Sequence, residues 1–177
     1  MIKPRLVSDS VRKKWNVAVR ILGIVVIILL TVNRPLTVTS QDNDTYISEV
    51  AYNACVEIGE MYGICPELLM AIIETESSGN PRAVNGNCKG LMQISVKWHQ
   101  DRMDRLGVTD IYNEYGNILV GTDYLMELAG QYGDVSYVLD KYNGNSKADY
   151  NYENGILSEY AAKILERSAQ LERIHGK

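Results

Sequence analysis

The sequence predicts an all-α domain that follows a single apolar segment near the N-terminus. From residue 46 onward, apolar residues recur at three- and four-residue steps, turn-forming residues separate these stretches, and there is no alternation typical of strands. At 177 residues, the chain has room for one domain and a short appendage. Its balance of 18 Lys and Arg against 22 Asp and Glu gives no reason to expect a nucleic acid as a partner.

The first 34 residues carry seven basic side chains and one acid, Asp9. We expect residues 1–14 to be a cytoplasmic basic segment and residues 15–34 to be a transmembrane signal-anchor. The apolar run in the second segment approaches the roughly 20 residues that span a bilayer, and the basic flank favours a cytoplasmic N-terminus. A cleaved signal peptide ending within 37–40 is the alternative. Both interpretations place the rest of the chain outside the cytoplasm, as a single-pass membrane protein or a secreted one.

A polar, turn-prone linker is expected at residues 35–45, before a folded domain at 46–177. The first helix of this domain begins near Tyr46 and ends at Gly63. The second helix has Pro66 in its first turn and stops near Ser77, where the turn-forming run Ser-Ser-Gly-Asn-Pro begins.

The second half of the domain contains helices separated by polar turns. A helix over Asn117–Leu128 should end before Gly130, and we expect Asn117 and Gly121 to cap and pack it. The remaining expected elements are a polar helix over His99–Leu106, a short helix over Val135–Tyr142, a polar stretch over Lys147–Gly155 and a last helix over Ser158–Ile174.

The three cysteines would lie in an oxidising compartment if the domain is exported. Their spacing resembles no metal site, and we expect no metal and no cofactor. We favour a disulfide between Cys65 and Cys88, on either side of the second helix. A Cys55–Cys65 pair and three free thiols are the alternatives.

Two carboxylates near the end of the second helix, Glu74 and Glu76, are candidates for general acid chemistry. Cleavage of a glycosidic bond needs a carboxylic acid whose pKa is raised by a partly apolar pocket. Residues two apart on a helix point about 200° away from each other, so both carboxylates cannot face one cleft.

Four stretches of the chain resemble, in the same order, motifs of the soluble lytic transglycosylase family. These stretches are Glu76-Ser77 with Asn80–Val84, Gly90–Ile94, Asn117–Leu125, and Tyr142-Asn143-Gly144. A tyrosine of the last helix, Tyr160, corresponds to another family position. The resemblance covers about residues 60–165, and it departs from the family at Asn85 and at Ser95-Val96, on the expected cleft rim.

The resemblance implies a lysozyme-like helical fold of the goose type and cleavage of peptidoglycan glycan strands. It selects Glu76 as the single acid and base, which would form 1,6-anhydro-N-acetylmuramic acid ends without consuming water. It also implies that Ser77, Gln93, Tyr142 and Asn143 contact the substrate or orient the acid. A small membrane-anchored member of this family would open the wall locally, for example within a secretion, conjugation or phage machinery.

Two other functions remain open from the sequence. A goose-type lysozyme would share the fold but would need a second carboxylate to activate water, and the acids that follow the Gly90–Ile94 stretch are Asp101 and Asp104. The other alternative is a catalytically silent module that binds peptidoglycan within an envelope complex. Its expected mark would be the loss of Glu76.

Overall fold

The computed structural model describes residues 45–177, so the predicted basic segment, the membrane anchor and nearly all of the linker lie outside the described residues. Within the described part of the chain, no helix is both long enough and apolar enough to cross a bilayer. This part contains the helices α2 (Glu49–Tyr62), α3 (Pro66–Ser77), α4 (Val96–Leu106), α5 (Glu114–Tyr132), α6 (Val135–Tyr142), α7 (Ala148–Asn154) and α8 (Glu159–Ile174).

The first two helices begin and end where their capping residues predict. The Ser48 side chain accepts a hydrogen bond from the Ala51 amide at the start of α2, and Gly63 ends that helix in the left-handed conformation. Pro66 occupies the first turn of α3, where its missing amide hydrogen costs nothing. The central residues of α3 are completely buried, which makes it the core helix of the domain.

A small antiparallel sheet corrects the expectation of a purely helical domain. Its strands are β1 (Val84–Asn85), β2 (Cys88–Lys89) and β3 (Ile94–Ser95), in the order β1-β2-β3. Each strand has only two residues, which is too short for an alternating apolar pattern to be visible in the sequence. The prediction of a mostly helical fold is confirmed, with this sheet as an addition.

Helices α2, α4 and α5 differ from the expected bounds, and one helix was not expected at all. Helix α2 begins at Glu49, three residues later than expected, and α5 begins at Glu114, three residues earlier. Helix α5 continues through Gly130 and ends at Tyr132, because Gly133 rather than Gly130 adopts the left-handed conformation. Helix α4 begins at Val96, three residues earlier than expected. The polar stretch contains α7, which buries only Ala148 and Asn151 and so has little apolar periodicity.

The helices α6 and α8 match their expected ranges. The Asp134 carboxylate caps the start of α6 by accepting bonds from the Ser136 and Tyr137 amides, and Ser158 caps the start of α8. The buried Asp140 of α6 accepts hydrogen bonds from Asn151 of α7 and from Ser158. These bonds tie the loop before α8 to the rest of the domain.

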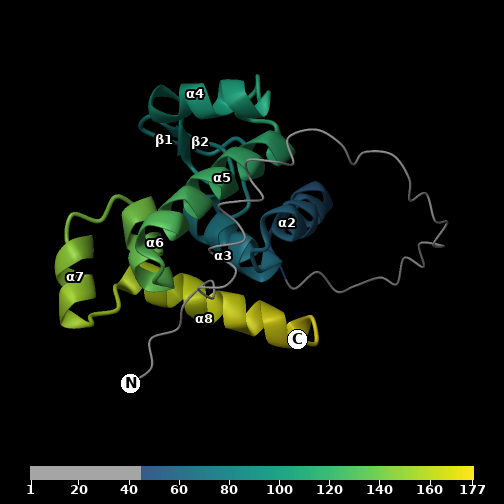
Figure 1. Ribbon diagram of the computed structural model, residues 1–177. Helices are drawn as coiled ribbons and strands as arrows, with labels where there is room; N and C mark the ends of the chain where they lie inside the picture. The colour runs from purple at the N-terminus through teal and green to yellow at the C-terminus, as the bar shows by residue number, and fades with distance from the viewer. Residues whose placement is uncertain (1–44) are drawn as a thin grey trace, which may run out of the picture.

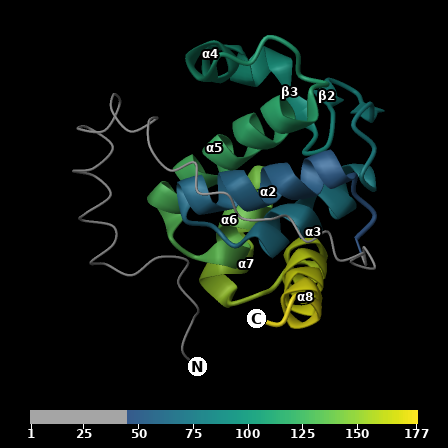
Figure 2. The ribbon, with the colours of Figure 1, turned by 90° about the vertical axis from the view of Figure 1, so that its right-hand side faces the viewer.

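The arrangement places the end of α3 between two parts of the domain. Figures 1 and 2 both show α4 and the small sheet at one end of the domain and α8 at the other, with α5 running between them. Helix α3 packs against α2 and α8, and α5 packs against α2 and α6. The last turn of α3 therefore lies where residues from α6, α8 and the β-hairpin can meet.

Candidate active site

Glu76 lies in the last turn of α3, which is followed by Ser78 as its cap in the left-handed conformation. Its side chain is partly buried, and burial raises the pKa of its carboxyl above the ordinary value of 4.5. The Tyr160 hydrogen bond and the positive charge of Lys163 oppose this rise without cancelling it. The site therefore favours a carboxylic acid over a carboxylate, compared with an exposed glutamate.

Tyr160, near the start of α8, donates a hydrogen bond from its hydroxyl to the Glu76 carboxylate. Burial and the nearby Glu76 charge raise the pKa of the Tyr160 hydroxyl, so this hydroxyl stays protonated and keeps donating. The bond joins residues 84 positions apart in the chain. It fixes the orientation of the acid relative to α8, and the sequence signalled this role only through the family position.

Tyr142 reaches the site from the end of α6. Its hydroxyl donates to the Met92 carbonyl oxygen at 2.8 Å. Burial, followed by the charge of Glu76, raises the pKa of this hydroxyl well above its ordinary value. Its ring lies 5.5 Å from that of Tyr124, centroid to centroid. The structure thus brings Tyr142 into the electrostatic surroundings of Glu76, and its substrate role remains a prediction.

Gln93 lies between β2 and β3 with a positive φ of 50°, which is unusual for a residue with a side chain. Its side-chain nitrogen donates to the Gly90 carbonyl at 2.9 Å and to the Ala83 carbonyl at 3.3 Å. Its side-chain oxygen is buried and has no hydrogen-bond partner among the described residues. A buried acceptor without a donor is costly, so this oxygen is one that a ligand or water would satisfy.

Asn117 holds the loop that carries Gln93, a role that the sequence did not indicate. We expected Asn117 to cap α5, but this residue is buried within the helix. Its oxygen accepts from the Met92 amide at 2.8 Å, and its nitrogen donates to the carbonyls of Lys89 and Ile111. A Cβ at Gly90 would collide with this side chain, which explains the glycine.

Two other expected contact residues have different surroundings. The Ser77 hydroxyl donates back to the Ile73 carbonyl at 3.0 Å within α3, which leaves its oxygen lone pairs as acceptors. Asn143 caps the end of α6, and its side chain is exposed. Among the described residues, the hydrogen bond to the Glu76 carboxylate comes from Tyr160 and not from these two side chains, and their substrate roles remain predictions.

The predicted Cys65–Cys88 disulfide is wrong for this structure, in which all three cysteines are free thiols. Cys65 precedes α3, whereas Cys88 lies near Glu76 at the other end of that helix. A helix of 12 residues rises about 18 Å, far more than the Cα separation that a disulfide permits. Within residues 45–177, no group of three or more His, Cys, Asp or Glu side chains is arranged to hold a metal ion.

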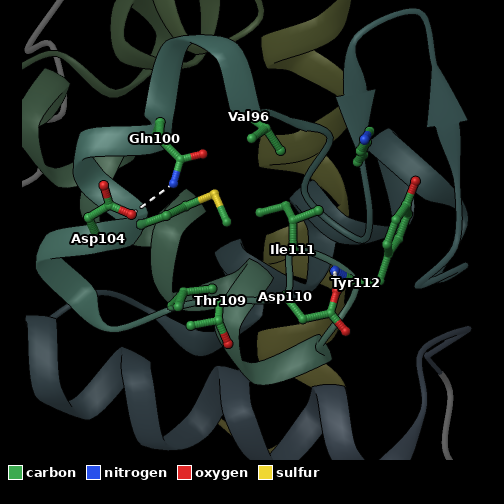
Figure 3. A pocket seen from close by; sticks show the side chains of 10 residues that line it. Val96, Gln100, Asp104, Thr109, Asp110, Ile111 and Tyr112 are labelled. Carbon is green, nitrogen blue, oxygen red and sulfur yellow. Dashed lines mark hydrogen bonds between the residues drawn. The ribbon is translucent and has the colours of Figure 1, made fainter.

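The acids considered for water activation lie on α4. Asp101 and Asp104 are both exposed, and Asp104 accepts a hydrogen bond from Gln100 at 2.8 Å. Asp104 lines a surface hollow of about 440 Å³ together with residues of the loop before α5. Figure 3 shows this hollow, with Gln100 and Asp104 on one side and Tyr112 on the other. Glu76 does not line it.

Comparisons with known proteins agree with this arrangement. The family model of the transglycosylase SLT domain matches residues 53–162. Over 86 residues the chain is 38% identical to a transglycosylase of Enterobacteria phage PRD1, covering 48% of this chain and 31% of the phage protein. Over 125 residues it is 29% identical to an endo-type membrane-bound lytic murein transglycosylase A of Citrobacter koseri, covering 66% of this chain and 61% of that protein.

A third relative is the invasion protein IagB of Salmonella typhi, at 27% identity over 126 residues, which cover 67% of this chain and 76% of that protein. The match spans less than two thirds of the length of the phage and Citrobacter proteins. The family model, by contrast, covers more than half of the chain and includes Glu76, Gln93, Tyr142 and Tyr160. The chain therefore belongs to the SLT transglycosylase domain family.

Proposed function

We propose that this protein is a peptidoglycan lytic transglycosylase that uses Glu76 as its single acid and base. The observation that carries the proposal is the partly buried Glu76 carboxyl, whose pKa is raised by burial while Tyr160 holds it in place. Family membership supports the same activity. The substrate is the β-1,4 bond between N-acetylmuramic acid and N-acetylglucosamine, in a lysozyme-like cleft at the end of α3.

The reaction needs two proton transfers at the same carboxyl group. Protonated Glu76 gives its proton to the glycosidic oxygen, the bond from this oxygen to C1 breaks, and positive charge develops at C1. The resulting carboxylate then takes the proton of the muramoyl 6-hydroxyl as its oxygen bonds to C1. The product is a 1,6-anhydro ring, Glu76 is protonated again, and no water is consumed.

The residues around Glu76 have distinct proposed roles. Tyr160 orients the acid, and Tyr142 positions the loop at Met92 while presenting its ring to the substrate. Gln93 contacts the substrate or orients the acid, as the resemblance implies, while its side-chain nitrogen holds the loop at Gly90 and Ala83. Ser77 and Asn143 make further contacts, through a hydroxyl acceptor and an exposed amide.

A hydrolytic lysozyme is a weaker proposal because it needs a second carboxylate near the acid. Among the described residues, the groups that shift the Glu76 pKa are Tyr160 and Lys163, and no other carboxylate acts on it. A silent binding module is also disfavoured, since the acid and its orienting tyrosine are both present. These observations favour the route in which the substrate supplies its own hydroxyl.

We also propose that the domain works outside the cytoplasm, held at the membrane by residues 15–34. The Citrobacter relative is named as membrane-bound. The phage relative is named a transglycosylase, and the Salmonella relative is named an invasion protein. A similar setting for this chain would be local opening of the wall by an envelope-spanning machinery.

The test is to incubate the full chain with purified peptidoglycan and to weigh the released fragments by mass spectrometry. We expect fragments that lack a reducing end and are lighter than hydrolytic fragments by one water. Glu76→Gln should reduce release by about 10³-fold, in the range that general acid catalysis contributes. Fragments with reducing ends would show a lysozyme, and wall binding without release would show a binding module.

A further inference from the structure

The residues just before α2, Thr45–Ile47, pack against the turn that follows Glu76, and we call them the pre-α2 segment. Gly79, in that turn, has a positive φ of 76°. A Cβ at Gly79 would collide with the carbonyl group of Tyr46 and would lie 3.3 Å from the Ile47 Cα. The two stretches of backbone therefore touch with no side chain between them. The Tyr46 side chain is 81% exposed, so this residue contributes its backbone to the contact.

The pre-α2 segment also contacts the last turn of α3 itself. The Tyr46 amide donates a hydrogen bond to the Glu74 carboxylate at 3.2 Å, and the same carboxylate pairs with Arg167 of α8 at 2.6 Å. Arg167 lies seven residues after Tyr160, which is two turns of helix, so both side chains leave α8 on the same face. Helix α8 thus holds the last turn of α3 through Glu74 as well as through Glu76.

The turn after Glu76 is held at its far end by the β-hairpin. The Ala83 carbonyl accepts hydrogen bonds from the Gly90 amide at 2.9 Å and from the Gln93 side chain at 3.3 Å. At its near end, the turn is held by the contact between Gly79 and the pre-α2 segment. Because both ends are fixed, a displacement at Gly79 cannot be absorbed by the hairpin and is passed to the last turn of α3, which carries the acid.

We propose that Gly79 is a positioning residue for Glu76 and acts through its contact with the pre-α2 segment, an inference that rests on the proposed function. The hydrogen bond from Tyr160 to Glu76 requires the last turn of α3 and the start of α8 to keep a fixed separation. The pre-α2 segment sets the place of that turn, through Gly79 and through the bond from the Tyr46 amide to Glu74. The point at which the predicted linker joins the domain therefore helps to orient the acid.

The test combines Gly79→Ala with Tyr160→Phe in the full chain, assayed on soluble, uncross-linked glycan strands. The added Cβ pushes the turn away from Tyr46, so we expect kcat to fall by roughly three- to ten-fold with KM nearly unchanged. The fall of kcat with rising pH should move to higher pH, because a weakened bond from Tyr160 lowers the Glu76 pKa less. In the Tyr160→Phe chain, where that bond is already absent, Gly79→Ala should cost about two-fold or less.

Two further variants separate the contact from backbone strain. Gly133→Ala adds a Cβ at a glycine with nearly the same φ, 74°, but with open space around it, and it should keep the kcat and the pH profile of the unmodified chain. In Gly79→Asn, the new residue adopts the left-handed conformation more readily than alanine does, yet its Cβ meets Tyr46 in the same way. Gly79→Asn should therefore show the same loss as Gly79→Ala.

Tyr46→Pro disturbs the contact from the other side. Proline has no amide hydrogen, so the bond to Glu74 is lost, and kcat should fall several-fold further than in Tyr46→Ala, which keeps that amide. This pair decides the question if thermal unfolding shows that Gly79→Ala does not fold. Equal kcat values for Tyr46→Pro and Tyr46→Ala would then overturn the inference.

With a folded Gly79→Ala, the inference is overturned if this variant retains the kcat and the pH profile of the unmodified chain, or if Gly133→Ala loses as much activity. It is also overturned if Gly79→Asn recovers full activity, or if the losses from Gly79→Ala and Tyr160→Phe multiply in the double variant. In each of these cases the proposed function still stands, because the unmodified chain cleaves the strands. No release by the unmodified chain would instead remove the proposed function, and this inference with it.

Discussion

The two ends of α3 each carry a glutamate, and their surroundings shift the two pKa values in opposite directions. Glu67, in the first turn, has only 1% of its surface exposed, yet its pKa is lowered to about 2. Glu76, in the last turn, is less buried, and its pKa is raised. Burial alone thus does not determine the direction of the shift; the partners do.

Positive groups and donors surround Glu67. Burial acts to raise its pKa, but hydrogen bonds from Lys177, Cys65 and His175 outweigh it. The Lys177 ammonium lies 2.8 Å and the His175 ring nitrogen 2.9 Å from one carboxylate oxygen. This cluster ties the C-terminus of the chain to the start of α3, which is a structural role.

The surroundings of Glu76 contain a neutral phenol and a lysine that is exposed. Neither compensates for burial, so the carboxyl keeps a tendency to hold its proton. The comparison teaches that, on the same helix, a charge-paired carboxylate stays ionised, whereas an underpaired one tends to hold its proton.

The largest expected effect on stability is that of Glu67→Gln. Glu67→Gln leaves the half-exposed Lys177 ammonium without its counter-charge and the buried site without its charged acceptor, which should cost about 2 kcal/mol at neutral pH. The folded-state pKa of about 2 lies below the ordinary 4.5, so the contribution is complete above pH 4.5 and is lost as the pH falls toward 2. Chemical denaturation at several pH values measures it, with the exposed Glu60→Gln as control. An equal cost at pH 2 and pH 7 would refute the ion-pair explanation.

The next effect is on catalysis, in Tyr160→Phe. The hydroxyl lowers the Glu76 pKa and orients its carboxyl, so its loss should reduce kcat about ten-fold, or about 1.4 kcal/mol. Since the acid must be protonated to act, activity falls as the pH rises through the Glu76 pKa, and this fall should move to higher pH in the variant. Tyr150→Phe, at an exposed tyrosine, is the matched control. A pH profile that does not move would argue against a direct action on the acid.

A smaller effect of opposite sign is expected in Glu76→Gln. A raised folded-state pKa means that the ionised carboxyl destabilises the fold at pH values above it, and contributes nothing below the ordinary 4.5. The neutral amide should therefore stabilise the domain at neutral pH by less than Glu67→Gln destabilises it, and the gain should vanish near pH 4. Denaturation of both variants in parallel provides the measurement. A loss of stability at pH 7 would mean that Glu76 is held as a charged group.

The smallest effect is expected in Glu74→Gln. Glu74 pairs with Arg167 and accepts a bond from the Tyr46 amide, on a different side of α3 from Glu76. The glutamine oxygen can still accept the two bonds made to one oxygen of Glu74, but its amide nitrogen cannot accept the Arg167 bond made to the other oxygen. We therefore expect a loss of about 1 kcal/mol and activity within a few-fold of the unmodified chain. A fall comparable to that of Glu76→Gln in the fragment-release assay would show that the two carboxylates are not separated as described.

The sequence predicted the parts of the fold that have local signals. Gly63, Pro66 and Ser158 mark helix ends through their own conformational preferences, and these ends were found where expected. The two-residue strands and α7 carry no such pattern. The strands depend on hydrogen bonds to a neighbouring strand, and α7 depends on packing of its two buried residues against the rest of the domain. Neither interaction leaves a local mark in the sequence.

The site was predictable only in part, for a similar reason. The resemblance singled out Glu76 and Tyr142, which the structure brings into one electrostatic environment. The anchoring of the loop by Asn117 and the paired state of Glu67 depend on residues far apart in the chain. The disulfide prediction failed because the two cysteines flank α3, and the length of this 12-residue helix keeps Cys65, before its start, apart from Cys88, near Glu76.

The most direct test of the central claim is an NMR titration of the glutamate carboxyl carbons in the full chain, with Glu76→Gln and Glu67→Gln used to assign the two signals. We predict that Glu76 titrates above 4.5 and Glu67 near 2. A Glu76 pKa at or below 4.5 would mean that its surroundings stabilise the charged form, and it would contradict the proposal that this carboxyl is the catalytic acid.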